Sequence, residues 1–182
     1  MIADSPILTG IFDGFSWIRC EGKGSFQNSP AVKEFGDARI AAGEKFLVVD
    51  LGACTGMDST FMGSLAGMAT RLSSKNRGVM QIADAGSRNQ RSLEDLGLDF
   101  LMEIAPPNPV WHDGIEEVRA ELKQQMAARQ LGQVQRAKHV LEAHQELTEV
   151  NDKNAKTFSN VVSMLETELE EKRKLAESQE KG

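Results

Sequence analysis

The sequence has little of what proteins outside the cell or within membranes require. Its two cysteines, Cys20 and Cys54, have neither the spacing of a metal site nor the number of a disulfide framework. No apolar run approaches the ~20 residues that cross a bilayer, and no basic stretch followed by an apolar one opens the chain. We therefore expect a cytoplasmic protein without a membrane span, in which both thiols are reduced.

Basic residues are also in the minority. The chain of 182 residues has 21 Lys and Arg against 27 Asp and Glu, so its net charge is −6. Binding of nucleic acid without regard to sequence needs a basic face, so we expect no nucleic-acid partner. Charged residues make up 26% of the chain, which argues against a disordered acidic tail. At roughly 100–200 residues per domain, the length fits one domain with or without an appendage.

Proline is scarce and divides the chain. Residues 106–109 read Pro-Pro-Asn-Pro, and no proline follows them. Three prolines in four positions exclude a continuous helix or a central strand there. Nearly all of the glycine lies before this segment. We predict a domain over residues 1–105, a proline-rich linker over 106–112 and a helical extension over 113–182.

Hydrophobic patterns in the first 105 residues alternate between the periods of strands and helices. The expected strands are 7–12, 15–20, 46–51, 79–83 and 101–104, and the expected helices are 29–42, 59–77 and 87–96. The Asp13-Gly14 pair between the first two strands predicts a hairpin, and the intervening helices imply that later strands run parallel. The prediction is an α/β fold, with a mixed sheet of about five strands that starts with a hairpin.

Three loops lead from a predicted strand into a predicted helix, over residues 22–28, 52–58 and 84–86. They should gather at the carboxyl ends of the strands, where open α/β sheets bind ligands and partners. Local signals add details. Ser29 before a proline predicts a helix N-cap, and Ser87-Arg-Asn-Gln90 predicts a capping box. Gly63 and Gly67 predict close packing of their helix on the sheet.

The most informative stretch is Cys-Thr-Gly-Met-Asp-Ser-Thr at 54–60. Asp58 is a candidate N-cap, and Ser59 falls in the first helical turn with its hydroxyl expected near solvent. Helix N-termini stabilise anions through free amide groups and partial positive charge. A phosphate on Ser59 would add about −1.5 to −2 charges, which an acidic or apolar partner would reject. The alternative is that Asp58, Ser59 and Thr60 only cap a helix.

In order, these motifs resemble the core of a STAS domain, the fold of bacterial anti-sigma factor antagonists. The shared pattern is a buried strand ending in Asp, an Asp-Ser pair before an apolar helix, a short strand and a Leu-Gly-Leu turn. This chain has Leu-Val-Val-Asp-Leu at 47–51, Met-Asp-Ser-Thr at 57–60, apolar positions over 65–72, a strand at 79–82 and Leu-Glu-Asp-Leu-Gly-Leu at 93–98. A weaker resemblance extends back to about residue 7.

The resemblance implies a regulator of transcription and signal transduction. In such antagonists, a serine kinase that doubles as an anti-sigma factor phosphorylates the serine of the Asp-Ser pair. Only the unphosphorylated form binds that kinase, and a phosphatase resets it. Carried over, Ser59 is the phosphorylation site and Thr60 a lesser candidate. The expected partner-binding residues are Asp58, Thr60, Asp50, Asn28 and Met57, with Asp50 ordering a loop.

One departure from the family pattern follows the serine. The family has a small residue, a glycine and an apolar residue there, whereas this chain has Thr60-Phe61-Met62-Gly63. The bulky Phe61 comes early and the glycine is delayed by two positions. We expect this change to reshape the partner surface, which leaves the identity of the partner open.

Other residues lack the spacing that catalysis or metal binding needs. The histidines are His112, His139 and His144. The last two are five residues apart instead of the four of a zinc pair, so we expect packed or solvated rings and no triad with Ser59. Asp50 and Asp58 could hold a metal or act as acid and base, but two carboxylates alone do not define a reaction. We expect no enzyme, no cofactor and no metal.

From residue 113 to about 178 the composition is that of a helix. Gly132 and the polar run 151–154 are possible breaks. The apolar stripe of such a helix must be buried. It could fold back on its own domain, pair with a second copy or dock another protein. We favour self-association, so a homodimer through these helices is expected. The alternative function is a STAS scaffold subunit, in a signalling or lipid-transport assembly, that oligomerises through this tail.

Overall fold

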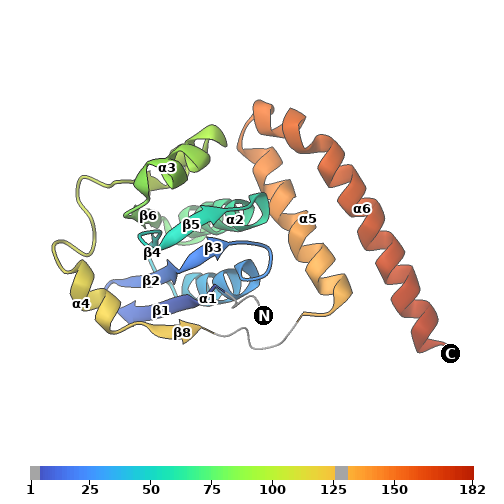
Figure 1. The fold of residues 1–182 in the computed structure, drawn as a ribbon, viewed down its shortest axis with the longest axis horizontal. Coiled ribbons are helices and arrows are strands. Elements are labelled where there is room, and N and C mark those ends of the chain that lie inside the picture. Colours follow the sequence, from blue (N-terminus) through green and yellow to red (C-terminus); the bar gives the residue numbers. More distant parts are fainter. Residues whose placement is uncertain (1–4, 126–130) are drawn as a thin grey trace.

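The computed structural model describes residues 5–125 and 131–182, and it contains a six-stranded sheet, a two-stranded sheet and a C-terminal helical hairpin (Figure 1). The strands are β1 Ile7–Phe12, β2 Phe15–Cys20, β3 Gly22–Gly24, β4 Phe46–Asp50, β5 Cys54–Met57, β6 Val79–Ala83, β7 Glu103–Ile104 and β8 Lys123–Gln125. The helices are α1 Ser29–Ala41, α2 Ser59–Asn76, α3 Gly86–Asp95, α4 Ile115–Ala120, α5 Gln133–Val150 and α6 Asp152–Glu180, with a 3-10 turn η1 at Leu98–Phe100.

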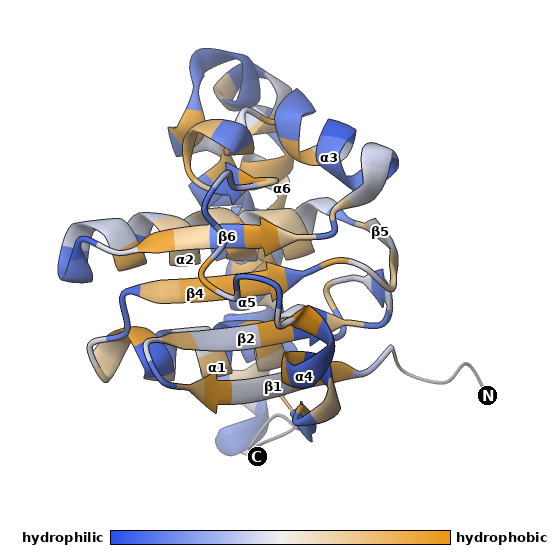
Figure 2. Cartoon of the chain, turned by 90° about the vertical axis from the view of Figure 1, so that its left-hand side faces the viewer, coloured by the Kyte–Doolittle hydropathy of each residue, from blue (hydrophilic) through white to orange (hydrophobic). Residues whose placement is uncertain are grey.

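The large sheet has the strand order β7-β6-β4-β2-β1-β8. The strands β2, β4, β6 and β7 are parallel, and β1 is antiparallel to both of its neighbours. Figure 2 shows β6, β4, β2 and β1 side by side, with α4 in front of them and α1 and α2 behind. The predicted α/β fold with a mixed sheet and an initial hairpin is therefore confirmed.

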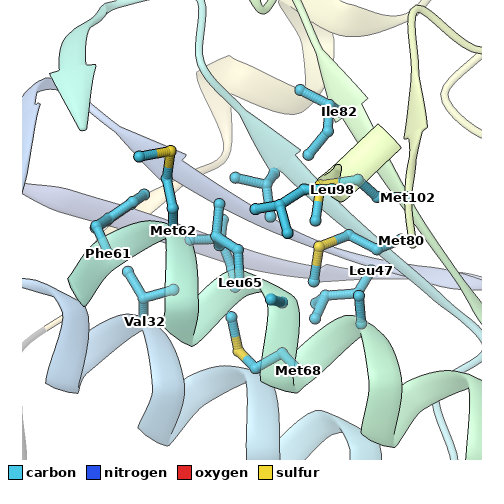
Figure 3. Packing of buried hydrophobic residues seen from close by; sticks show 14 of the residues in the cluster. Val32, Leu47, Phe61, Met62, Leu65, Met68, Met80, Ile82, Leu98 and Met102 are labelled. Atoms are coloured by element: carbon cyan, nitrogen blue, oxygen red, sulfur yellow. The ribbon is translucent and has the colours of Figure 1, made fainter. Parts of the chain in front are cut away.

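The central strand β4 is buried on both faces because helices cover both. Leu47 and Val49 belong to the core that α1 and α2 complete, and Val48 belongs to a second cluster with Val118 of α4. Figure 3 shows Leu65 and Met68 of α2 within the first core. The alternation follows from the period of two along a strand, and continuous apolar runs are typical of strands covered on both sides.

The proline-rich segment lies against the second face of the sheet. Trp111, at its end, packs edge-on against Trp17 of β2, with ring centroids 5.3 Å apart. The backbone amide of Val110 donates to Oε1 of Gln81 over 2.9 Å. The segment that we predicted as a linker thus contacts the sheet and leads directly into α4.

Three strands were not predicted. β3 and β5 lie in segments predicted as loops, and they pair in parallel with each other. β8 lies in the segment predicted as helix and pairs with β1, so the helical prediction is wrong for residues 123–125. These strands have three or four residues and are rich in glycine or polar side chains. Such segments carry no hydrophobic period, and only their tertiary partners make them strands.

Two predicted helix caps are wrong, and three other predictions on helix ends are confirmed. Asn28, not Ser29, is the N-cap of α1, and α3 begins after Ala85 without a side-chain cap. Asp58 is the N-cap of α2, as predicted. The predicted breaks at Gly132 and after residue 150 are the N-caps of α5 and α6.

The C-terminal hairpin folds back on the domain that precedes it. α5 packs against α2, and α6 packs against α5 (Figure 1). Leu147 of α5 is fully buried in the main core. Gly63 and Gly67 face α5 and not the sheet, which corrects our expectation, because α2 is buried on two sides. Within the described parts of the chain, no helix is long and apolar enough to cross a membrane.

Candidate functional site

The loops that were expected to gather at one end of the sheet meet there. The amide of Asp58 donates to the carbonyl of Gly24 over 2.9 Å, next to the pairing of β3 with β5. The side-chain amide of Asn89, in α3, donates to the carbonyl of Cys54 over 2.9 Å. These bonds join the segments before α1, α2 and α3 into a single surface, which we call the switch surface (residues 22–28, 52–60 and 84–88).

Asp58 links two parts of the switch surface through one carboxylate. Its Oδ1 accepts from the amide of Phe61 over 2.8 Å, which caps α2, and its Oδ2 accepts from the amide of Phe26 over 2.9 Å. Asn28 orders the same loop, since its Oδ1 accepts from the amide of Ser25 over 2.8 Å. Both predicted residues therefore hold the loop in place, and both are half-buried.

Ser59 begins α2, but its hydroxyl does not point freely into solvent. Its Oγ lies 2.8 Å from Nε2 of His144, in α5. Nδ1 of His144 lies 2.7 Å from the carbonyl oxygen of Val140, which can only accept. Nδ1 therefore carries a proton, and in the neutral ring Nε2 accepts from the Ser59 hydroxyl. His144 is only 6% exposed, and Phe158 packs edge-on against it.

A second serine and histidine repeat this arrangement. Ser29 begins α1, and its Oγ lies 2.7 Å from Nε2 of His139, which also belongs to α5. The helix α5 thus contacts the first residues of both α1 and α2. The histidines are packed, as one of our alternatives expected, but their serine partners could not be foreseen. The pairs are 85 and 110 residues apart in sequence, and no local pattern signals such contacts.

Asp50 is fully buried at the end of β4, and five hydrogen bonds satisfy it. Arg119 donates from Nε over 2.9 Å and from Nη2 over 3.0 Å, and Arg19 donates from Nη1 over 2.8 Å. Trp17 Nε1 and the amide of Gly52 donate over 3.2 and 2.9 Å. Burial acts to raise the pKa of Asp50, but the bonds from Arg119, Arg19 and Gly52 outweigh it and hold the pKa below its ordinary value.

The remaining predicted partner residues lie mostly beneath the surface. The side chains of Asp50 and Thr60 are 0% and 4% exposed, so they could support a partner surface but not touch a partner. Met57 is half-buried against the main core. Sequence reasoning missed Phe26, a 49% exposed aromatic residue in the loop that Asp58 holds. An aromatic residue within a glycine-rich polar loop was the available signal.

The departure from the family pattern after the serine has a structural explanation. Phe61 is fully buried, and a methyl group added at Gly24 would lie 2.8 Å from its ring. The phenyl ring fills the core under the loop and does not reshape the partner surface directly, contrary to our expectation. The backbone of α5 packs against Gly63, the glycine that comes two positions late. Both changes serve internal packing.

The two free cysteines lie close together beside the switch surface. Cys20 is buried and Cys54 is half-buried. A hydrogen bond with Cys20, together with backbone amides at Gly56 and Gly24, lowers the pKa of Cys54 to about 6 against the opposing effect of burial. The same hydrogen bond and burial raise the pKa of Cys20. Cys54 is therefore the more readily ionised thiol of the pair.

The chemistry open to this site is limited. His144 can hold the proton of Ser59, but its other nitrogen donates to a backbone carbonyl and not to a carboxylate, so the pair differs from a Ser-His-Asp triad. Asp50 and Asp58 are each engaged by donors of the fold. Over residues 5–125 and 131–182, no three His, Cys, Asp or Glu residues are placed to hold a metal ion.

The comparisons with known proteins agree with this fold. The family model for the STAS domain matches residues 7–108. A candidate anti-sigma factor antagonist of Thermotoga maritima has 20% identity and a TM-score of 0.50, with 61% of this chain and 92% of that chain covered. An anti-sigma factor antagonist from Mycobacterium paratuberculosis has 24% identity and a TM-score of 0.49, with coverages of 64% and 97%. The antagonist SpoIIAA in its unphosphorylated form has 16% identity and a TM-score of 0.48, with coverages of 63% and 98%. The comparison with curated proteins finds no match.

The buried charge cluster predicts a large effect of Arg119. In the variant Arg119→Ala, Asp50 loses two of its donors while it stays buried, so we expect a loss of about 2–4 kcal/mol in the free energy of unfolding. Urea unfolding followed by circular dichroism measures it. The control Arg91→Ala removes an exposed arginine of α3 and should change the free energy by less than about 0.5 kcal/mol. Equal effects of the two variants would contradict the role of the cluster.

The buried His139 predicts that stability falls in mild acid. Burial lowers the pKa of His139 and Lys33 adds to this, while Glu142 and Asp58 act in the opposite direction. Because the unfolded chain then binds the proton more tightly, stability is lost as the pH falls below about 6.5. We expect a smaller loss between about pH 7 and pH 5.5 for His139→Gln, which keeps a polar partner for Ser29. Urea unfolding at both pH values tests this, and identical pH dependences would contradict it.

Proposed function

Because the chain belongs to the STAS domain family, we propose that it is a protein-binding switch, an anti-sigma factor antagonist controlled by phosphorylation of Ser59. The proposed partners are a serine kinase that acts as an anti-sigma factor and a phosphatase that removes the phosphate. Neither role requires chemistry by this chain itself, so we propose a binding protein of the cytoplasm and not an enzyme.

The observation that carries the proposal is the position of Ser59. It is the first residue of α2, directly after the Asp58 cap and next to the loop that carries the exposed Phe26. The start of a helix tolerates a phosphate because free amide groups and the helix dipole favour negative charge. A partner that covers the apolar Phe26 would have to desolvate that phosphate, which disfavours binding. One modification would thereby change the affinity for the partner.

Other residues of the switch surface would then have supporting roles. Asp58 and Asn28 hold the loop that presents Phe26, and Asp50 accepts from the amide of Gly52 at the start of the segment that leads to Ser59. The exposed side chains of Lys23, Thr55 and Arg88 lie on the segments around Ser59. They are the positions at which a partner would be recognised.

A second candidate function is self-association through α6, and the exposed apolar residues of that helix favour it. Met164 is 71% exposed and Leu175 is 56% exposed. A shallow hollow of about 490 Å³ runs beside Met164, Val161 and Leu165. A second copy of the same helix is the proposed occupant, so that the protein would be a scaffold subunit that assembles through its tail.

The switch predicts a phosphate on Ser59 in the cell. Intact-mass spectrometry of the protein purified from its native host should show an addition of about 80 Da, which fragmentation maps to Ser59. The host strain carrying Ser59→Ala should lack the addition, and Thr60→Ala should keep it. A phosphate that persists in Ser59→Ala, or its absence under all growth conditions, would refute control through Ser59.

Self-association predicts a dimer that depends on Met164. Light scattering during size-exclusion chromatography should give twice the mass of 20.0 kDa for the wild type and one mass for Met164→Lys. Ser159→Lys is the matched control, because Ser159 is exposed five residues away on a different side of the helix. A wild type that stays monomeric at high concentration rules this assembly out.

A further inference from the structure

We propose that the α5–α6 hairpin is a separable cap that closes over Ser59 and must lift before a kinase or a partner can reach it. This inference rests on the proposed role of Ser59 and adds a regulator within the same chain. In the closed state that the structure describes, α5 occupies the place beside the starts of α1 and α2 (Figure 1). The cap then competes in cis with any protein that binds there.

The cap contacts the hydroxyl of Ser59 itself. The Ser59 hydroxyl hydrogen bonds to His144, and Ser29 holds His139 in the same way at the start of the neighbouring helix. Transfer of a phosphoryl group needs an incoming group in line with Oγ of Ser59. His144 stands at that side chain, and Phe158 packs edge-on against His144. In the closed state, α5 therefore occupies the position that the kinase would need in order to reach Ser59.

On α2, two glycines form the seat of the cap, the surface against which α5 packs. A methyl group added at Gly63 would overlap the backbone of Ala143 in α5, and one added at Gly67 would lie 3.0 Å from the side chain of Glu146. For Gly63, the three nearest atoms all belong to Ala143. Helices approach so closely only where side chains are absent. The glycines that α2 carries are thus fitted to α5 and are not needed by the sheet.

The hairpin can keep its own structure when it lifts. It has a separate apolar cluster between its two helices, made of Ala137, Leu141 and Leu169 with Val134, Val162 and Leu165. By contrast, part of its boundary with the domain is polar. A cavity of about 510 Å³ lies between Lys33, Asp37 and Arg71 on the domain side and Glu142, Glu146 and Glu149 on the α5 side.

The hairpin is attached to the domain by an apolar contact, which Leu147, Val150 and Phe158 make with the main core, and by polar bonds. Leu147 enters the main core, and the side-chain amide of Asn154 donates to the carbonyl of Leu96 over 2.8 Å. The Arg71–Glu146 ion pair spans 3.8 Å between half-exposed groups, and pairs of this kind add little stability. Both hairpin helices also lie beyond the STAS match, which ends at residue 108. The STAS fold therefore does not itself require the cap.

The coupling between the cap and the phosphate works in both directions. A phosphate on Ser59 cannot occupy the 2.8 Å gap between Oγ and Nε2 of His144, so modification favours the lifted state. Conversely, anything that lifts the cap exposes the Ser59 hydroxyl and so favours its modification. A partner that draws the hairpin away would thus prepare Ser59 for the kinase.

Variants of the full chain test the cap from both sides of one contact. Gly63→Leu on α2 and Ala143→Glu on α5 should each lift the hairpin, since Ala143 is only 3% exposed at the seat. Gly132→Ala is the matched control, because an added methyl group there meets nothing within 4 Å. Hydrogen exchange measured by mass spectrometry reports protection in α5 and in the strands β4 and β6 separately.

Access to position 59 is measured without any kinase. Ser59→Cys is introduced into each background, and its labelling by a bulky maleimide is followed by peptide mapping, which separates it from Cys20 and Cys54. We expect labelling and α5 exchange to be faster by about tenfold or more in both cap variants, with β4 and β6 still protected. The Gly132→Ala control should behave like the wild type.

Two results would overturn the cap. Loss of protection in β4 and β6 together with α5 would make the hairpin an integral part of the domain. A lifted hairpin with unchanged labelling at position 59 would mean that it does not control access. The proposed switch is tested separately, by measuring the phosphate occupancy of Ser59 in the host in the same variants. Absence of the phosphate in every background refutes the switch. The exchange and labelling results still decide whether the hairpin is a cap.

Discussion

A buried carboxylate at the end of the central strand holds the two halves of this chain together. Asp50 is fully buried and is satisfied by Arg19 of β2 and by Arg119 of α4. Arg119 also reaches Asp84, after β6, over 2.8 Å. One arginine from beyond the proline-rich segment thus ties the ends of two neighbouring parallel strands. Because an unpartnered buried charge is costly, α4 and the strand ends depend on each other.

This clamp decides where the rest of the C-terminal half can go. With α4 held against one face of the sheet, the chain passes through β8 at the edge beside β1, and α5 lies on the other side, against α2. The helical half is therefore not an independent appendage. It contributes an edge strand, a helix on one face of the sheet and a cover for the helices on the other face, although it lies outside the residues that match the STAS family.

In the switch surface, hydrogen bonds hold the loops in place, and α5 contacts Ser59. Asp58 and Asn28 fix the loops through main-chain bonds, while Ser59 and Ser29 are tied to histidines of α5. Imidazole is suited to such a contact because one ring nitrogen can accept the serine hydroxyl while the other donates elsewhere. The same position thus serves as a cap contact and as the proposed site of a phosphate, and the two uses exclude each other.

Sequence patterns alone predict the strands with continuous apolar runs, the hairpin turn, the start of α2 at Asp58 and the resemblance to the STAS family. These features follow from local chemistry: the hydrophobic periodicity of strands and helices, the residues of the hairpin turn, and the Asp58 side chain that caps an amide three residues later. Tertiary structure alone decided β3, β5 and β8, the burial of Asp50 by Arg119, and the closure of α5 over Ser59. Each of these joins residues far apart in the chain, such as Ser59 and His144. Residue types in order do not specify such contacts, because the partners of a polar side chain depend on which surfaces the packed core brings together.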